Sequence, residues 1–144
     1  MMKKFSSSLI FLIAMLFSIS SYADIETENF RVILAPAVAK STAAYGVIKN
    51  VGVEADTLID IRSDAAMVML HKTEINSGMA KMIHMPNLVI EAGSELVLEP
   101  MSYHLMLSGL STEKFKQDET IILLLEFEKM GVIEIEVPIV PAWE

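Results

Sequence analysis

Short apolar runs separated by turn signals limit this chain to an all-β fold. The clearest case is a pair of runs at 121–128 and 132–137, joined across Lys129-Met130-Gly131. In the second run, branched apolar residues alternate with Glu134 and Glu136, so one face of the strand is buried and the other is wet. Two such runs with a short turn between them predict a β-hairpin.

The same pattern continues through most of the chain. Further apolar runs, bounded by turn-forming residues, lie at 30–35, 43–50, 57–62, 66–72, 81–85, 88–90, 95–99 and 104–107. The segment 111–119 is polar, so we expect a loop with room for one helical turn. No internal repeat or linker interrupts the pattern, which predicts a single domain built as an antiparallel β-sandwich.

The N-terminus has the pattern of a secretory signal peptide. Two lysines stand at its start, and an apolar run at 9–19 follows them. This run is short for a membrane anchor, which is the alternative interpretation. Small residues at Ser21 and Ala23 are those that signal peptidase reads, so we expect cleavage after Ala23. The predicted boundaries are a signal peptide at 1–23 and an exported domain at 24–144.

The charge balance and the absence of cysteine exclude several classes of function. The predicted mature domain has 121 residues with 9 basic and 19 acidic side chains, a net charge of −10, which disfavours nucleic acid as a partner. The 144 residues contain no cysteine. They therefore offer no disulfide, thiol nucleophile, blue-copper site or lipid-modified cysteine.

Methionine and histidine are concentrated in one stretch of the chain. Seven of the eleven methionines and all three histidines lie between residues 67 and 106. Thioether sulfur and imidazole nitrogen suit Cu(I) better than they suit magnesium or calcium. Because alternate side chains of a strand share a face, His104 and Met106 can offer two ligands to one ion. His71 could add a third ligand and Met82 a fourth if their strands are neighbours.

These four residues have the spacing H-x10-M-x21-H-x-M. With this motif, the chain closely resembles the periplasmic copper chaperones of the PCuAC family. Similar segments extend over nearly the whole mature chain: Ala43-Ala44-Tyr45, Asp56-Thr57-Leu58, and the stretches 78–82, 103–110 and 125–128. The resemblance implies a cupredoxin-like Greek-key β-sandwich that binds one Cu(I) ion. The ligands that it implies are His71, Met82, His104 and Met106.

The resemblance also implies a function and partners. A protein of this family acts in the periplasm as a metallochaperone that delivers copper to the dinuclear copper centre of cytochrome c oxidase, directly or with a thiol-bearing Sco-type protein. We expect a monomer that is not embedded in the membrane. We also expect no enzymatic activity, since no nucleophile–base or acid–base pair stands out. Two alternatives are a periplasmic copper buffer or resistance protein with the same site, and a metal-free interaction module whose methionines belong to the core.

One segment departs from the family pattern. Family members usually have Pro-Gly-Gly just before the Tyr-His pair, whereas this chain has Pro100-Met101-Ser102. Glycine permits backbone angles that Met and Ser do not easily adopt, so we expect the shape of this loop and the position of His104 to differ slightly. Met101 is expected to pack on the surface, and a spare thioether near the ion is the alternative.

The other Met and His residues of the stretch have ordinary explanations. Met67 and Met69 are expected to fill gaps in the packing, as flexible methionine side chains do. Met79 and Met85 flank a proposed ligand, so they either pack or shield the ion from water. His84 lies outside the motif and is expected to be a solvated histidine.

Overall fold

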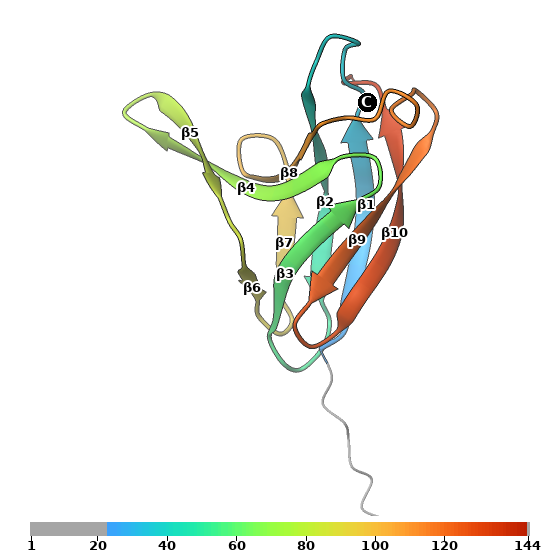
Figure 1. The fold of residues 1–144 in the computed structure, drawn as a ribbon. Helices are drawn as coiled ribbons and strands as arrows, with labels where there is room; N and C mark the ends of the chain where they lie inside the picture. Colours follow the sequence, from blue (N-terminus) through green and yellow to red (C-terminus); the bar gives the residue numbers. More distant parts are fainter. Residues whose placement is uncertain (1–22, 144) are drawn as a thin grey trace, which may run out of the picture.

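The computed structural model describes residues 23–143. Within this range the chain forms ten strands (Figure 1): β1 (Ile25–Ile33), β2 (Ser41–Asn50), β3 (Asp56–Ser63), β4 (Met67–Asn76), β5 (Met79–His84), β6 (Leu88–Ile90), β7 (Glu95–Leu98), β8 (Tyr103–Ser108), β9 (Thr120–Phe127) and β10 (Gly131–Val140). The same range has no helix with the length and hydropathy needed to cross a membrane. The predicted signal peptide at 1–23 lies outside the described residues, except for Ala23.

All ten strands belong to one curled sheet with the order β5-β4-β8-β7-β2-β1-β10-β9-β3-β6. Neighbouring strands are antiparallel except in the pairs β1–β10 and β7–β8, which are parallel. The curl brings the half with β4 and β8 to face the half with β3 and β9 (Figure 1). Buried side chains from both halves form one core, which includes Leu70, Leu105, Leu123 and Phe127. The predicted all-β, single-domain sandwich is confirmed.

Every apolar run that we named between residues 30 and 137 forms a strand, although several ends are shifted. The largest shift at a strand start is in β1, which begins at Ile25 and not at residue 30. Residues 26–28 are polar, yet they pair with β2, and a bulge with Asn29 at a φ of 53° separates them from the rest of the strand. Polar residues hide a strand of this kind from sequence analysis, because backbone hydrogen bonds form whatever the side chains are.

The β4–β5 hairpin carries part of the Met and His stretch away from the body of the sandwich (Figure 1). β4 continues to Asn76 and β5 starts at Met79, so both strands extend further toward the turn than predicted. Ser77 and Gly78 form the two-residue turn, with φ values of 52° and 78°. Two consecutive positive φ values are typical of a type I′ turn, whose twist matches that of a hairpin. This turn sets the register between the two strands.

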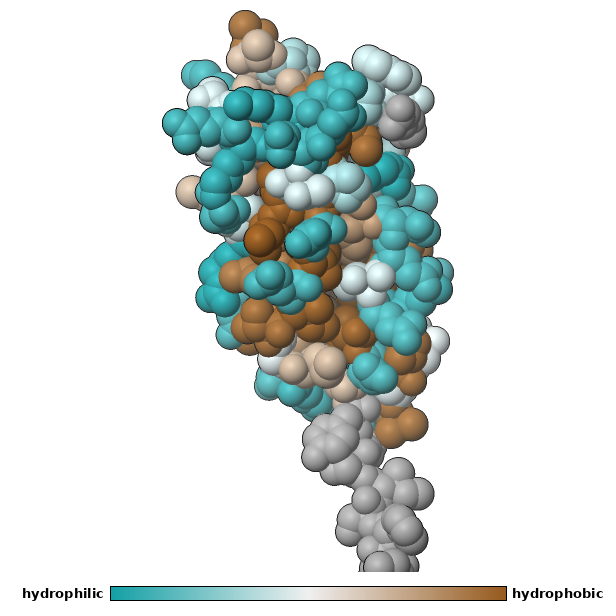
Figure 2. All heavy atoms as spheres, turned by 90° about the vertical axis from the view of Figure 1, so that its right-hand side faces the viewer, coloured by the Kyte–Doolittle hydropathy of each residue, from teal (hydrophilic) through white to brown (hydrophobic). Residues whose placement is uncertain are grey.

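The side of the molecule formed by β9 and β10 has a mixed surface. Figure 2 shows hydrophobic residues on this side among hydrophilic ones. Ile122 and Val132 are exposed apolar residues of these strands, while Glu134 and Glu136 alternate with apolar residues along β10 as predicted. Neither strand carries a candidate ligand, so the site belongs to the other half of the sheet.

Candidate metal site

β4 lies between β5 and β8, and its register with both strands places three imidazoles in one row. His71 on β4 is opposite His84 on β5 and opposite His104 on β8. Side chains of directly opposite residues lie on the same face of a sheet. The three histidines therefore share one face of the sheet, with His71 in the middle.

The methionines of the predicted ligand set lie on the same face, one row away from the histidines. Met106 is opposite Met69, and Met82 is opposite Thr73. Both predicted methionine ligands are therefore diagonal neighbours of His71, in opposite directions along β4. The structure places all four predicted ligands on one face of three adjacent strands, and their role as ligands remains a prediction.

The other face of β4 and β8 belongs to the core. Val68 and Leu70 of β4 and the two leucines of β8 are buried there, as strand alternation predicts. On the candidate face, exposure rises from the inner strand to the edge strand: the His104 residue on β8 is 6% exposed, and Met82 on β5 is 61% exposed. The candidate site therefore has a buried side and a side open to solvent.

Neighbouring imidazole rings are close enough to reach one metal ion, although the planes of His71 and His104 are stacked with 22° between them. The ring centroids of His71 and His104 are 6.0 Å apart, and those of His71 and His84 are 5.5 Å apart. With a metal–nitrogen distance of about 2 Å, two imidazoles on one ion have centroids roughly 5 to 6 Å apart. His84 and His104 lie two strands apart, or roughly 10 Å at the backbone. An ion on this face therefore uses one pair of rings at a time.

Carboxylates do not complete a site in this row. Among residues 23–143, no group of three or more His, Asp or Glu side chains is arranged to hold a metal ion. Thioethers, by contrast, are present on both sides of His71. The donor set on this face is therefore nitrogen and sulfur, which suits a soft metal ion.

The ring of His104 is held by a backbone carbonyl. Nδ1 of His104 lies 3.1 Å from the carbonyl oxygen of Ser102, which also accepts a hydrogen bond from the N–H of Thr73 at 3.0 Å. A carbonyl oxygen can only accept, so Nδ1 is the nitrogen that carries the proton. In the neutral ring, Nε2 then has the free lone pair and is the atom that can bind a metal.

The turn that supplies this carbonyl has an unusual backbone. The N–H of Ser102 donates to the carbonyl of Glu99, and between them Met101 has a φ of 65°. This is the left-handed region, which costs a residue other than glycine about 1–2 kcal/mol. The chain therefore adopts at Met101 the kind of conformation that glycine favours. The Met101 side chain itself is exposed.

Burial keeps His71 in the form that binds metals. Its Nδ1 atom is buried and has no hydrogen-bond partner among the described residues. Loss of solvation lowers the pKa of His71, and the nearby rings of His104 and His84 lower it further, because two positive charges would repel. A metal ion requires the neutral ring, so His71 stays competent to bind at a lower pH than a solvated histidine does.

The other methionines of the stretch differ in position. Met69 is opposite Met106 on the candidate face, and Met79 is exposed at the start of β5. Met85 packs against the core, so its position favours packing over shielding of an ion. The expectation that Met67 fills a packing gap is wrong, because its side chain is exposed at the start of β4.

His84 is the residue of this site whose place sequence analysis missed. It is exposed, as expected for a solvated histidine, but it also lies beside His71. The signal that would have found it is the Ser77-Gly78 turn. Counting outward from a two-residue turn pairs residue 76 with 79 and, five steps further, His71 with His84.

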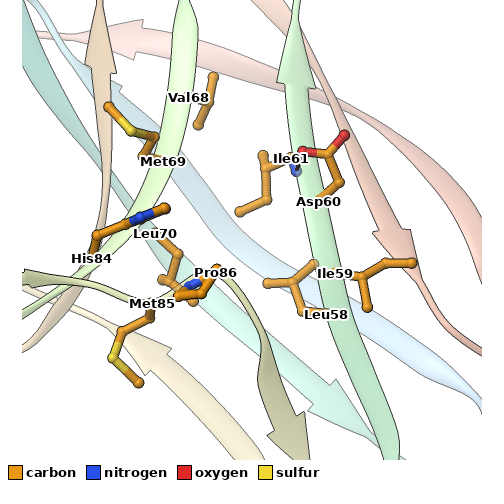
Figure 3. A pocket seen from close by; sticks show the side chains of 10 residues that line it. All are labelled: Leu58, Ile59, Asp60, Ile61, Val68, Met69, Leu70, His84, Met85 and Pro86. Carbon is orange, nitrogen blue, oxygen red and sulfur yellow. Dashed lines mark hydrogen bonds between the residues drawn. The ribbon is translucent and has the colours of Figure 1, made fainter.

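A small hollow opens beside the site, between β3 and β4. Its volume is about 50 Å³, which is small next to the roughly 300–1,000 Å³ of a pocket for an organic ligand. Figure 3 shows Leu58 and Ile61 of β3 on one side of the hollow and Met69 and His84 on the other. The hollow does not suit an organic substrate.

Comparison with protein families gives one match over most of the chain. The LpqE-like family, described as lipoprotein LpqE-like, matches residues 25–139. The 144 residues of this chain have no cysteine to carry a lipid. No curated protein matches the chain.

Comparison with solved structures gives PCuAC domains. The copper-bound PCuAC domain from PmoF2 is 18% identical, with a TM-score of 0.69 over 83% of this chain and 95% of that domain. The solution structure of Cu(I)-bound DR1885 from Deinococcus radiodurans is 24% identical, with a TM-score of 0.68 over 87% of this chain and 84% of that one. These likenesses confirm the cupredoxin-like fold that the sequence resemblance implies.

Proposed function

Because this chain belongs to the LpqE-like family and has the fold of PCuAC domains, we propose that it binds copper and passes it to another protein. The proposed ligands of a single Cu(I) ion are His71, Met82, His104 and Met106. The observation that carries the proposal is the register of β4 with β5 and β8, which puts all four side chains on one face. Two of the similar proteins were solved with copper bound, which supports the choice of metal.

The donor atoms suit a carrier of Cu(I). Thioethers and neutral imidazoles bind this soft ion without adding negative charge, and thioethers cannot be lost to disulfide formation in an oxidising compartment. Nδ1 of His104 is occupied by the Ser102 carbonyl, so Nε2 is its proposed ligand atom. His71 adds a second imidazole from the adjacent strand.

The exposure of the ligands sets the order in which we expect them to exchange. Met82 lies on the edge strand and is open to solvent, so it is the ligand that an incoming donor atom replaces first. His104 is buried and is expected to be released last. A stepwise exchange of this kind moves the ion between two proteins without a free intermediate.

The compartment and the acceptor follow from the family resemblance. We place the mature protein in the periplasm as a monomer, after cleavage at Ala23, where it delivers copper to the dinuclear copper centre of cytochrome c oxidase, directly or through a Sco-type protein. A copper buffer with the same site is the alternative. Mixing the Cu(I)-loaded protein with the apo copper subunit of the oxidase separates the two, because a buffer retains its ion and a chaperone transfers it.

Anaerobic titration with Cu(I) against a chromophoric chelator tests the site. We expect one equivalent to bind. Met82→Leu and Met106→Leu keep the side-chain volume but remove one thioether each, so each should weaken binding by about tenfold or more. Met130→Leu, in the turn between β9 and β10, is the matched control and should leave the Kd unchanged.

A double variant gives the decisive outcome. If His104→Ala combined with Met106→Ala binds Cu(I) as tightly as the wild type, these residues are not ligands. A chain that binds no Cu(I) at all would instead be a metal-free interaction module. Circular dichroism of each variant shows whether a loss of binding reflects a loss of fold.

A further inference from the structure

We propose that His71 and His84 form a second metal position, which takes Cu(II) with water completing its coordination. This position goes beyond the proposed Cu(I) site, with which it shares only His71. Its two ligands come from the two strands of one hairpin, β4 and β5, and not from β8.

The geometry of the hairpin supports the pair directly. His71 and His84 are opposite residues in the β4–β5 register, so their side chains leave the sheet on the same face. Their ring centroids are 5.5 Å apart and the ring planes are tilted by 48°. This separation lies within the roughly 5 to 6 Å that suits two imidazoles on one ion. The type I′ turn at Ser77-Gly78 holds the register that produces it.

The backbone of Met69 interacts with the His71 ring, but not closely enough to satisfy its buried Nδ1 atom. Its Nδ1 atom is buried and has no hydrogen-bond partner among the described residues. A buried polar atom without a partner is costly and calls for a partner such as an ion. His104 differs, because the Ser102 carbonyl already occupies its Nδ1.

The surroundings of the pair favour Cu(II) over Cu(I). His84 lies exposed on the edge strand, so water can reach an ion bound there. Imidazole nitrogen and water oxygen are the ligands that Cu(II) takes in tetragonal sites, whereas thioethers select Cu(I). Each side of His71 also carries a thioether two residues from its histidine, Met106 beside His104 and Met82 beside His84, so the access of water to His84 is what distinguishes the hairpin side.

The position of His71 between the two other histidines makes the two sites share one ligand. His84 and His104 lie two strands apart, so one ion does not reach both rings. An ion held with His104 is in a buried setting, and an ion held with His84 is in a solvated one. The oxidation state of copper thus decides on which side of His71 it binds.

Electron paramagnetic resonance of the protein with one equivalent of Cu(II) tests the proposal, because nitrogen hyperfine structure counts the bound imidazoles. We expect two nitrogens in the wild type and one in His84→Gln, with a Cu(II) affinity lower by about tenfold or more. His104→Gln is the matched control and should keep two nitrogens. If His104→Gln loses a nitrogen, or if neither variant does, the assignment to His71 and His84 is overturned.

A parallel Cu(I) titration keeps this proposal separate from the proposed function. His84→Gln should leave the Cu(I) affinity unchanged, whereas Met82→Leu and Met106→Leu should weaken it and leave the Cu(II) spectrum as in the wild type. Normal Cu(I) binding with no imidazole on Cu(II) overturns the second position alone. A two-nitrogen Cu(II) spectrum that depends on His84, in a protein that binds no Cu(I), overturns the proposed function alone.

Discussion

Replacing Met101 with glycine should stabilise the protein, because Met101 has a φ of 65° in the turn before β8. The left-handed conformation costs a residue other than glycine about 1–2 kcal/mol. Glycine itself lowers the free energy of unfolding by about 0.5–1 kcal/mol, since it loses more conformational entropy on folding. Met101 is 61% exposed, so its removal sacrifices little buried area. The expected net gain in the free energy of unfolding is about 0.5–1 kcal/mol, or a rise in Tm of about 2–4 °C.

Urea denaturation of the copper-free protein, followed by far-UV circular dichroism, measures this gain. Ser102→Gly is the matched control, because Ser102 is the next residue and its φ is not positive. Glycine there should lower the free energy of unfolding by about 0.5–1 kcal/mol. Opposite signs for the two variants support the reasoning. A Met101→Gly variant that loses as much stability as Ser102→Gly refutes it.

Four further predictions concern packing, hydrogen bonding and protonation. Gly46→Ala should cost about 1–3 kcal/mol, because the new Cβ would lie 2.6 Å from Cδ2 of Phe30. Thermal denaturation checks this, and the double variant with Phe30→Ala should cost less than the sum of the two single ones. Asp56→Ala should cost about 3 kcal/mol, because this 1% exposed carboxylate accepts three backbone N–H bonds, two of them from the β9–β10 turn. A loss in urea denaturation far below 1 kcal/mol would contradict that role. The pKa of His71 is lower in the folded protein than in the unfolded chain, so the unfolded chain binds the proton at a higher pH. The free energy of unfolding therefore has its full His71 contribution above about pH 6.5 and loses it as the pH falls further. In His71→Gln, the free energy of unfolding should fall less between pH 7 and 5 than in the wild type. An equal fall in both proteins would show that His71 is not the cause. Protonation also competes with copper, so Cu(I) affinity should fall below about pH 6, and an affinity that stays flat from neutral pH to well below pH 5 would exclude a site with two histidines.

Much of the site could be predicted from periodicity within single strands. Alternation along β8 puts His104 and Met106 on one face and Leu105 and Leu107 in the core, and the structure agrees. Periodicity alone could not show that β4 and β8 are neighbours, because pairing between strands more than 30 residues apart depends on the whole topology. The motif spacing, read through the family resemblance, supplied that link.

The parts that sequence analysis missed depend on exact register and backbone angles. A shift of one residue in the β4–β5 turn would move His84 to the other face, so its place beside His71 follows only from the Ser77-Gly78 turn. At Met101, residue type argued against the left-handed conformation, yet the surrounding turn imposes it. In both places, context outweighs the preference of the single residue.

The division of β4 and β8 into a core face and a proposed metal face has a consequence for how such a protein can evolve. Substitutions at Met82 or Met106 alter the donor atoms without touching the side chains that fold the sandwich. Mutation can therefore change the metal that the site prefers, or remove metal binding, while the fold is kept. His104 is the exception, because it is 6% exposed and selection for packing and selection for metal act on the same ring. In diverging descendants, this histidine should be the slowest of the four to change.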